Sequence, residues 1–271
     1  MAYLLQGELL RLLDPLLARA AAFRTSPWAD FCARHWPVPL AVAAAYVASV
    51  LAGSRWLVLC GGRPLKLGLP LLLWNTLLTA FSLAGLLIIA PPFLRDLAKL
   101  GAAELICPRS GVAGEHFESG SRGLAMLAFM LSKLPELADT AFLIARGKPV
   151  GFLHSFHHTS VMVYCWFAYG QRSSSGLFFA VMNYAVHSLM YFYYSLQAAG
   201  LKPTWGPLVT RIQIAQMVAG VLIVAASAWL QLAQGRNCEE PAVLGAAAFI
   251  YFAYLTLFVR FYLMKAAGKS L

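Results

Sequence analysis

Seven long apolar stretches follow one another along the chain, separated by shorter polar segments. Each approaches the roughly 20 apolar residues that an α-helix needs to cross the hydrocarbon core of a bilayer. Strand-like alternation is absent, and a lipid-exposed backbone must satisfy its hydrogen bonds within helices or a closed barrel. We therefore predict an all-α, polytopic membrane protein whose seven transmembrane helices form a bundle, at residues 38–59, 68–90, 123–145, 150–170, 176–198, 207–232 and 242–264.

The composition agrees with a membrane protein. Of the 271 residues, 60% are hydrophobic and 12% are charged, whereas soluble domains contain about 25% charged residues. We expect an N-terminal interfacial segment over 1–36, a membrane domain over 37–265 and a cytosolic tail over 266–271. We also expect Pro91-Pro92 to end the second helix.

The net charge of +10 suggests a nucleic-acid partner until its distribution is considered. With seven spans, one set of loops carries ten basic residues and no acid, and the opposite set carries six basic residues once the N-terminal segment is left out. By the positive-inside rule, this distribution places the C-terminus in the cytosol. The expected partner of the basic residues is therefore the lipid bilayer, and no nucleic acid is expected.

Two cysteines, Cys107 and Cys238, fall on loops of the opposite, non-cytosolic set. An oxidising compartment on that side would allow a disulfide to persist. The compartment alone leaves open whether the two cysteines are joined.

Ionisable side chains at membrane depth are costly and usually face a protein interior or a water-filled cavity. The third stretch contains Lys133, Glu136, Asp139 and Thr140, which would lie on one polar side of a continuous helix. A salt bridge between Lys133 and Glu136 is the simplest structural explanation. Three charges within seven residues exceed what one pair needs, so a functional site is favoured.

Three histidines, His154, His157 and His158, open the fourth stretch. Their positions span an arc of about 100° on a helix, so all three can face one cavity. Polar side chains also recur on one face of the next two stretches: Asn183, His187, Met190 and Tyr194, then Thr210, Gln213 and Gln216. Core packing or interhelical hydrogen bonding could explain parts of these stripes, but Asn183 with His187 fits packing less well.

Three functions are compatible with this histidine cluster. Membrane desaturases and hydroxylases also use an H-x-x-H-H box, but they hold their irons with several boxes, and here a mononuclear metal site stays open on ligand count. Alternatively, one imidazole accepts an acyl group while its neighbour moves protons, since burial favours the neutral, nucleophilic ring. A non-enzymatic seven-span receptor or transporter would use the charges for ligand or proton movement.

Four polar blocks occur in a fixed order along the chain. They are K-x-x-E-x-x-D-T from Lys133, H-x-x-H-H from His154, N-x-x-x-H-x-x-M-Y from Asn183 and T-x-x-Q-x-x-Q from Thr210. Together they resemble the signature blocks of the ELO family of very-long-chain fatty acid elongases. The aromatic run that follows His187 looks more like the branch that acts on saturated and monounsaturated substrates.

The resemblance implies a multi-pass enzyme of the endoplasmic reticulum membrane, a 3-oxoacyl-CoA synthase. Such an enzyme condenses a long-chain acyl-CoA with malonyl-CoA, releases CO2 and CoA, and gives a 3-oxoacyl-CoA two carbons longer, with no metal or other cofactor. Its expected partners are the ketoacyl-CoA reductase, the dehydratase and the enoyl-CoA reductase of the elongation cycle, and a second copy of the chain in a homo-oligomer.

Carried onto this chain, the resemblance implies that His157 receives the acyl group in a ping-pong mechanism. His154 and His158 would orient it or relay protons, and His187 with Asn183 would stabilise charge at the reacting carbonyl. The substrates would be held by Lys133, Glu136, Asp139, Tyr191, Tyr194, Thr210, Gln213 and Gln216. From their location at the cytosolic edge, Arg146, Lys202 and Arg260 are expected to bind the CoA phosphates.

Overall fold

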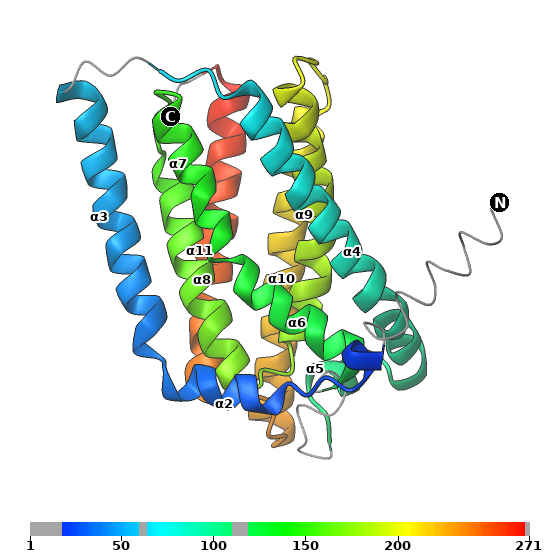
Figure 1. Ribbon diagram of the computed structural model, residues 1–271. Helices are drawn as coiled ribbons and strands as arrows, with labels where there is room; N and C mark the ends of the chain where they lie inside the picture. Colours follow the sequence, from blue (N-terminus) through cyan, green and yellow to red (C-terminus); the bar gives the residue numbers. More distant parts are fainter. Residues whose placement is uncertain (1–17, 60–63, 110–118, 269–271) are drawn as a thin grey trace.

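The computed structural model describes residues 18–59, 64–109 and 119–268, and these residues form a helical bundle (Figure 1). Within them there is no β-strand beyond an isolated bridge between Arg24 and Ser119, so the predicted all-α class is confirmed for this part of the chain. The elements are α2 (Ser26–Arg34), α3 (Pro37–Leu59), α4 (Gly68–Leu100), α5 (Ala102–Ile106), α6 (Gly120–Ser132), the 3-10 turn η1 (Pro135–Leu137), α7 (Ala138–Ala145), α8 (Phe152–Gly170), α9 (Gly176–Ala198), α10 (Gly206–Gln234) and α11 (Pro241–Ala266).

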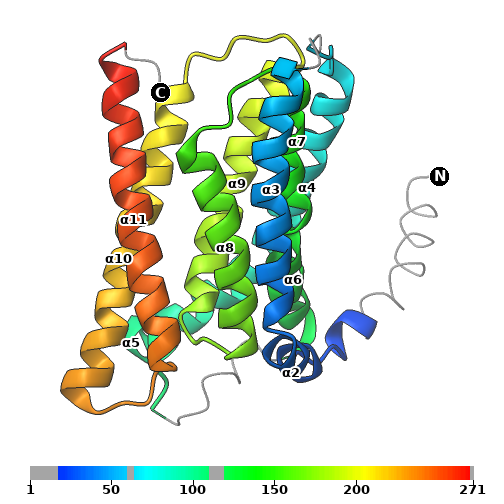
Figure 2. The ribbon, with the colours of Figure 1, turned by 90° about the vertical axis from the view of Figure 1, so that its left-hand side faces the viewer.

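The long helices run along a common direction, and α2 lies across one end of the bundle (Figures 1 and 2). Among the described residues, three helices are long and apolar enough to cross a membrane: α4, α10 and α11. Helix α2 and the first part of α3, bent by 64°, make a fourth candidate. The predicted count of seven spanning helices is therefore not confirmed, although membrane-spanning helices are present.

The third apolar stretch is not the single helix that we predicted over 123–145. Helix α6 ends at Ser132, η1 follows, and α7 begins at Ala138. Pro135 explains the break, because it has no backbone N–H and its ring clashes with the carbonyl four residues earlier in an α-helix. Angular positions calculated for an unbroken helix are therefore wrong for this segment.

The prediction that Pro91-Pro92 ends the second helix is also wrong, since α4 continues to Leu100. Prolines are tolerated within membrane helices because neighbouring elements satisfy the freed backbone groups. Buried side chains flank the pair on α4, and Phe93 packs edge-on against Phe178 of α9 with ring centroids 4.9 Å apart. Helix α4 is thus packed against α9 at the point where it continues past the two prolines.

A disulfide joins Cys107, at the end of α5, to Cys238, in the loop between α10 and α11. Their Cα atoms are 4.6 Å apart, and both side chains are buried. The pairing that the sequence left open is thus present in the structure. It ties α5 to the α10–α11 loop at the same end of the bundle as α2 (Figure 1).

The predicted division into 1–36, 37–265 and 266–271 is only partly within the described residues, because 1–17 and 269–271 lie outside them. The described end of the N-terminal segment contains α2. Trp28, Phe31 and Trp36 are exposed there, and such aromatic side chains are common at membrane–water interfaces. The segment boundaries stay a prediction.

Candidate active site

Lys133 and Glu136 form a buried ion pair at the break between α6 and α7. Lys133 Nζ donates to Glu136 Oε1 at 2.7 Å and to Asn183 Oδ1 of α9 at 3.0 Å. Ser132 Oγ donates to the same glutamate oxygen at 2.8 Å. The bond from Lys133 to Asn183 holds the turn against α9. Removing either member of the ion pair would leave the other as a buried, uncompensated charge.

His187 lies one helical turn beyond Asn183 and meets the same ion pair. Its Nδ1 atom is 3.9 Å from Glu136 Oε2, and its ring packs edge-on against Tyr191 at 5.4 Å between centroids. The blocks of the third and fifth apolar stretches therefore meet in one interior.

Both carboxylate oxygens of Asp139 accept hydrogen bonds from side chains on other helices. Trp74 Nε1 of α4 donates to Oδ1 at 2.6 Å, and Tyr191 OH of α9 donates to Oδ2 at 2.8 Å. Asp139 thereby fixes the first turn of α7 between α4 and α9. The role of Trp74 had no signal in the sequence, because a tryptophan in an apolar helix equally suits packing or an interfacial position.

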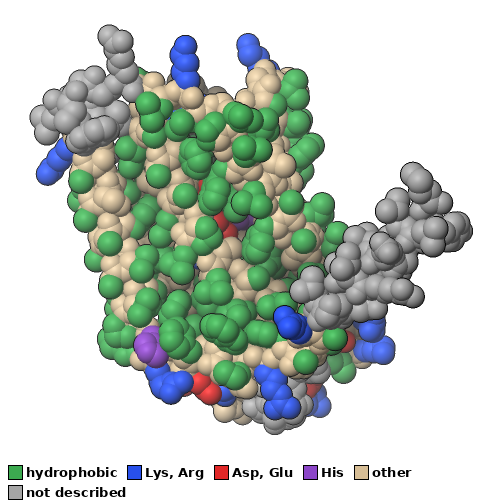
Figure 3. All heavy atoms as spheres, in the orientation of Figure 1, with side chains coloured by type: hydrophobic (Ala, Val, Ile, Leu, Met, Phe, Trp, Pro, Cys, Tyr) green, Lys and Arg blue, Asp and Glu red, His purple; other side chains and the backbone are tan. Residues whose placement is uncertain are grey.

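Thr140 connects the broken third stretch to the histidines. Its hydroxyl is 2.8 Å from His154 Nε2 and 2.7 Å from Tyr46 OH of α3. On α8, the ring of His158 lies 4.3 Å from that of His154 and 5.6 Å from that of His157, between centroids. Acidic and histidine side chains are visible in a recess near the middle of one face of the bundle (Figure 3).

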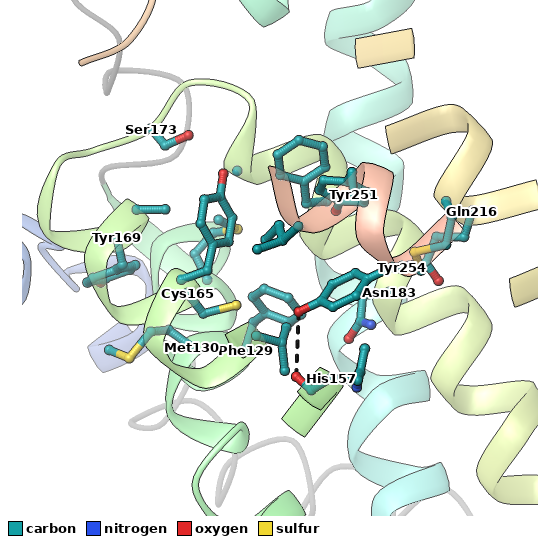
Figure 4. Close-up of a pocket in the computed structure, with 18 residues that line it drawn as sticks. Phe129, Met130, His157, Cys165, Tyr169, Ser173, Asn183, Gln216, Tyr251 and Tyr254 are labelled. Carbon is teal, nitrogen blue, oxygen red and sulfur yellow. Dashed lines mark hydrogen bonds between the residues drawn. The ribbon is translucent and has the colours of Figure 1, made fainter. Parts of the chain in front are cut away.

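An apolar cavity of about 60 Å³ lies beside these groups, and of the four histidines His157 is the one that lines it. His157, Asn183 and Gln216 lie toward one end of the cavity, and Tyr169 and Ser173 lie toward the other (Figure 4). Tyr169 lies twelve residues after His157 on α8, which corresponds to about 18 Å of helix.

Tyr254 of α11 is a further residue beside His157 that the sequence did not reveal. The two rings are 4.9 Å apart between centroids. Tyr254 OH donates to the His157 carbonyl oxygen at 3.5 Å (the dashed line in Figure 4) and is 2.7 Å from Ser160 Oγ. Within an apolar and aromatic helix, nothing in the pattern distinguishes this tyrosine from its neighbours.

The remaining predicted substrate residues are placed differently from one another. Thr210 and Tyr191 are buried, whereas Tyr194 is exposed. Gln213 Nε2 is 3.3 Å from Met190 Sδ, so α10 contacts the same face of α9 at this position. Of the stripe on α10, it is Gln216 that reaches the cavity.

The three predicted CoA-binding residues lie at the end of the bundle opposite the disulfide, at or near helix ends. They are Arg146, Lys202 and Arg260. Arg146 caps the C-terminus of α7, Lys202 follows α9, and Arg260 lies in the last two turns of α11. Lys202 and Arg260 are exposed. Among the described residues, no three His, Cys, Asp or Glu side chains are grouped so that they could hold a metal ion.

The fold and the site thus define a helical membrane protein in which the buried Lys133–Glu136 ion pair reaches, through Asn183, a cavity that His157 also lines. A model described as the ELO: GNS1/SUR4 family matches residues 31–270, and the chain belongs to this family. The resemblance found in the four sequence blocks is therefore confirmed.

Several curated relatives cover most of the chain. Fatty acid elongase 3 of Trypanosoma cruzi (strain CL Brener) is 36% identical over 96% of this chain and 95% of its own length. Very long chain fatty acid elongase 6 of Drosophila melanogaster is 37% identical over 80% of this chain and 72% of its own. The protein of the same name from Gallus gallus is 32% identical over 87% of each chain.

Proposed function

We propose that this protein is the condensing enzyme of fatty acid elongation, a very-long-chain 3-oxoacyl-CoA synthase. It converts a long-chain acyl-CoA and malonyl-CoA into a 3-oxoacyl-CoA two carbons longer, CO2 and CoA. The single observation that carries the proposal is the position of His157, where a buried polar network meets an apolar cavity along α8. The names of the relatives support the same activity.

In the first half-reaction, a ring nitrogen of His157 attacks the thioester carbonyl. The new N–C bond forms, the C–S bond breaks, and CoA leaves as the thiol with the proton that the ring gives up. The ring of His158 packs against the rings of both His157 and His154, and the hydroxyl of Thr140 holds the ring of His154. This order suits a role for His158 and His154 in orienting the nucleophile and passing on its proton.

In the second half-reaction, malonyl-CoA loses CO2, and its carbon attacks the acyl carbonyl while the bond to His157 breaks and the ring takes up one proton from water by way of His158 and His154. Negative charge develops first on the malonyl thioester oxygen and then on the acyl oxygen. Asn183 lines the cavity and its Oδ1 is held by Lys133, so its amide N–H groups are available to donate to these oxygens. His187, held beside Glu136, would add a further donor.

The acyl tail would lie in the cavity, where each buried CH2 contributes about 0.8 kcal/mol to binding. Tyr191, Gln213 and the residues of the ion pair would support the walls near the thioester. The CoA phosphates would bind at the end of the bundle that carries Arg146, Lys202 and Arg260. From the resemblance, we expect saturated or monounsaturated substrates. The mechanism requires no metal or other cofactor.

We further propose that seven segments cross the endoplasmic reticulum membrane with the C-terminus in the cytosol. The disulfide supports this orientation, because disulfides persist in oxidising compartments and this one lies at the end opposite Arg146, Lys202 and the last turns of α11. The other enzymes of the elongation cycle, and a second copy of the chain, are the proposed partners.

The proposal is tested with purified protein, palmitoyl-CoA and malonyl-CoA, by measuring 3-oxostearoyl-CoA and released CO2. His157→Ala should abolish both, whereas His35→Ala, at an exposed histidine that caps α2, should not. Without malonyl-CoA, the peptide that contains His154–His158 should gain the mass of the acyl group. Turnover that survives His157→Ala would exclude the assigned nucleophile. Stoichiometric iron in the purified protein, measured by elemental analysis, together with no condensation would instead support a metal oxygenase.

A further inference from the structure

The far end of the cavity from His157 is polar, although the walls between are apolar. Tyr164, Tyr169 and Ser173 all line the cavity, and each is more than nine-tenths buried. The hydroxyl of Tyr164 faces Ser173 and that of Tyr169 faces Thr25, but neither hydroxyl reaches a described residue with the geometry of a full hydrogen bond. Leaving a hydroxyl buried and unpaired costs about 1–3 kcal/mol, so this end of the cavity is suited to a polar guest.

Ser173 complements these donors with an acceptor. Its Oγ donates to Glu239 Oε1 at 2.9 Å and lies 3.3 Å from Ser175 Oγ, which commits the hydroxyl hydrogen and one oxygen lone pair and leaves the second lone pair for the cavity. Glu239 also accepts from the backbone N–H of Ser175 at 2.9 Å, and its second carboxylate oxygen has no partner among the described residues. A single hydroxyl guest could thus accept from Tyr164 and donate to Ser173.

The position of these groups limits where the guest can be attached. Tyr164 lies seven residues beyond His157 on α8 and Tyr169 twelve, which correspond to about 10 and 18 Å of helix. An acyl chain joined to His157 would therefore bring its far end, rather than its carboxyl end, to the polar groups. The apolar wall before them, including Phe129 and Cys165, suits methylene groups.

Resting on the proposed condensing activity, we propose that the far end of the cavity is a subsite for a hydroxyl group at the ω end of the acyl chain, so that ω-hydroxyacyl-CoA is a substrate class of this enzyme. The cavity of about 60 Å³ is also large enough for water, which needs roughly 10–15 Å³ per molecule. Water is therefore the competing occupant, and the test has to distinguish the two.

The test compares ω-hydroxypalmitoyl-CoA with palmitoyl-CoA in condensation with malonyl-CoA, at matched concentrations, and then extends the comparison to shorter and longer pairs. The ratio of kcat/KM for the hydroxylated to the unsubstituted chain should peak at one chain length, where the hydroxyl meets the subsite. Tyr164→Phe keeps the ring and removes one donor, and should lower that peak ratio roughly three- to tenfold.

Tyr184→Phe is the matched control. It removes a buried tyrosine hydroxyl that donates to the Ala125 carbonyl, outside the cavity, and should leave the ratio unchanged. A ratio that does not depend on chain length, or that is the same in Tyr164→Phe as in the wild type, would overturn the subsite and indicate water alone. Failure to condense palmitoyl-CoA at all would instead overturn the proposed function.

Discussion

Lys133→Met should strongly destabilise the protein, because it removes the ammonium group that lies 2.7 Å from Glu136 Oε1. The side chains of Lys133 and Glu136 are 2% and 5% exposed, and breaking a buried pair in this way costs about 3–5 kcal/mol. At roughly 2–4 °C per kcal/mol for a chain of this size class, the unfolding midpoint should fall by about 10 °C. Thermal unfolding in detergent, followed by tryptophan fluorescence, measures the change.

The double variant Lys133→Met/Glu136→Gln distinguishes a coupled pair from two separate contributions. Because the second change removes the uncompensated charge, the double variant should be more stable than Lys133→Met alone. It should not regain condensing activity, since Asn183 has still lost the donor to its Oδ1. Arg109→Met, at a surface pair with Glu104, should cost less than about 1 kcal/mol. Strictly additive losses would refute the reasoning.

Two further predictions concern packing and the covalent link. Replacing Cys107 and Cys238 together by Ser should lower stability by about 5 kcal/mol, because the bridge closes a loop of 131 residues; an equal midpoint for both proteins under oxidising conditions would contradict this. Gly220→Ala places a Cβ against the ring of Tyr251 and should cost about 1–3 kcal/mol, whereas Gly245→Ala, with open space around it, should cost less than half as much in the same unfolding assay.

The sequence could predict which charged and histidine residues gather in the site, because these residue types are unexpected in an apolar helix. Lys133, Glu136 and His187 are costly at membrane depth, so their presence predicted a shared interior, and the structure brings these three together. The family followed from the order of such residues. Their chemical roles stay proposals, because proximity alone does not identify a nucleophile.

Aromatic residues that contact the site through a polar atom could not be predicted, because in the sequence they look like ordinary packing residues. Trp74 and Tyr254 differ from neighbouring aromatic residues only in what their polar atoms reach, Asp139 in one case and Ser160 and the His157 carbonyl in the other. These contacts depend on how distant helices meet. The break at Pro135, by contrast, had a local signal, which the apolar run around it outweighed.

The buried Ser173–Ser175 turn and the disulfide beside it have a consequence for the timing of the proposed reaction. Ser174 Oγ donates to the carbonyl oxygens of Ile106 and Cys238, so this turn is held against the covalently linked segments. If the anchored turn closes that end of the cavity, a product whose tail points toward it would leave by the route through which it entered. Each added CH2 deepens the exit barrier by about 0.8 kcal/mol, and a tenfold change corresponds to 1.4 kcal/mol. Residence time, and with it the step that limits turnover, would then shift from bond formation to product departure as chains lengthen.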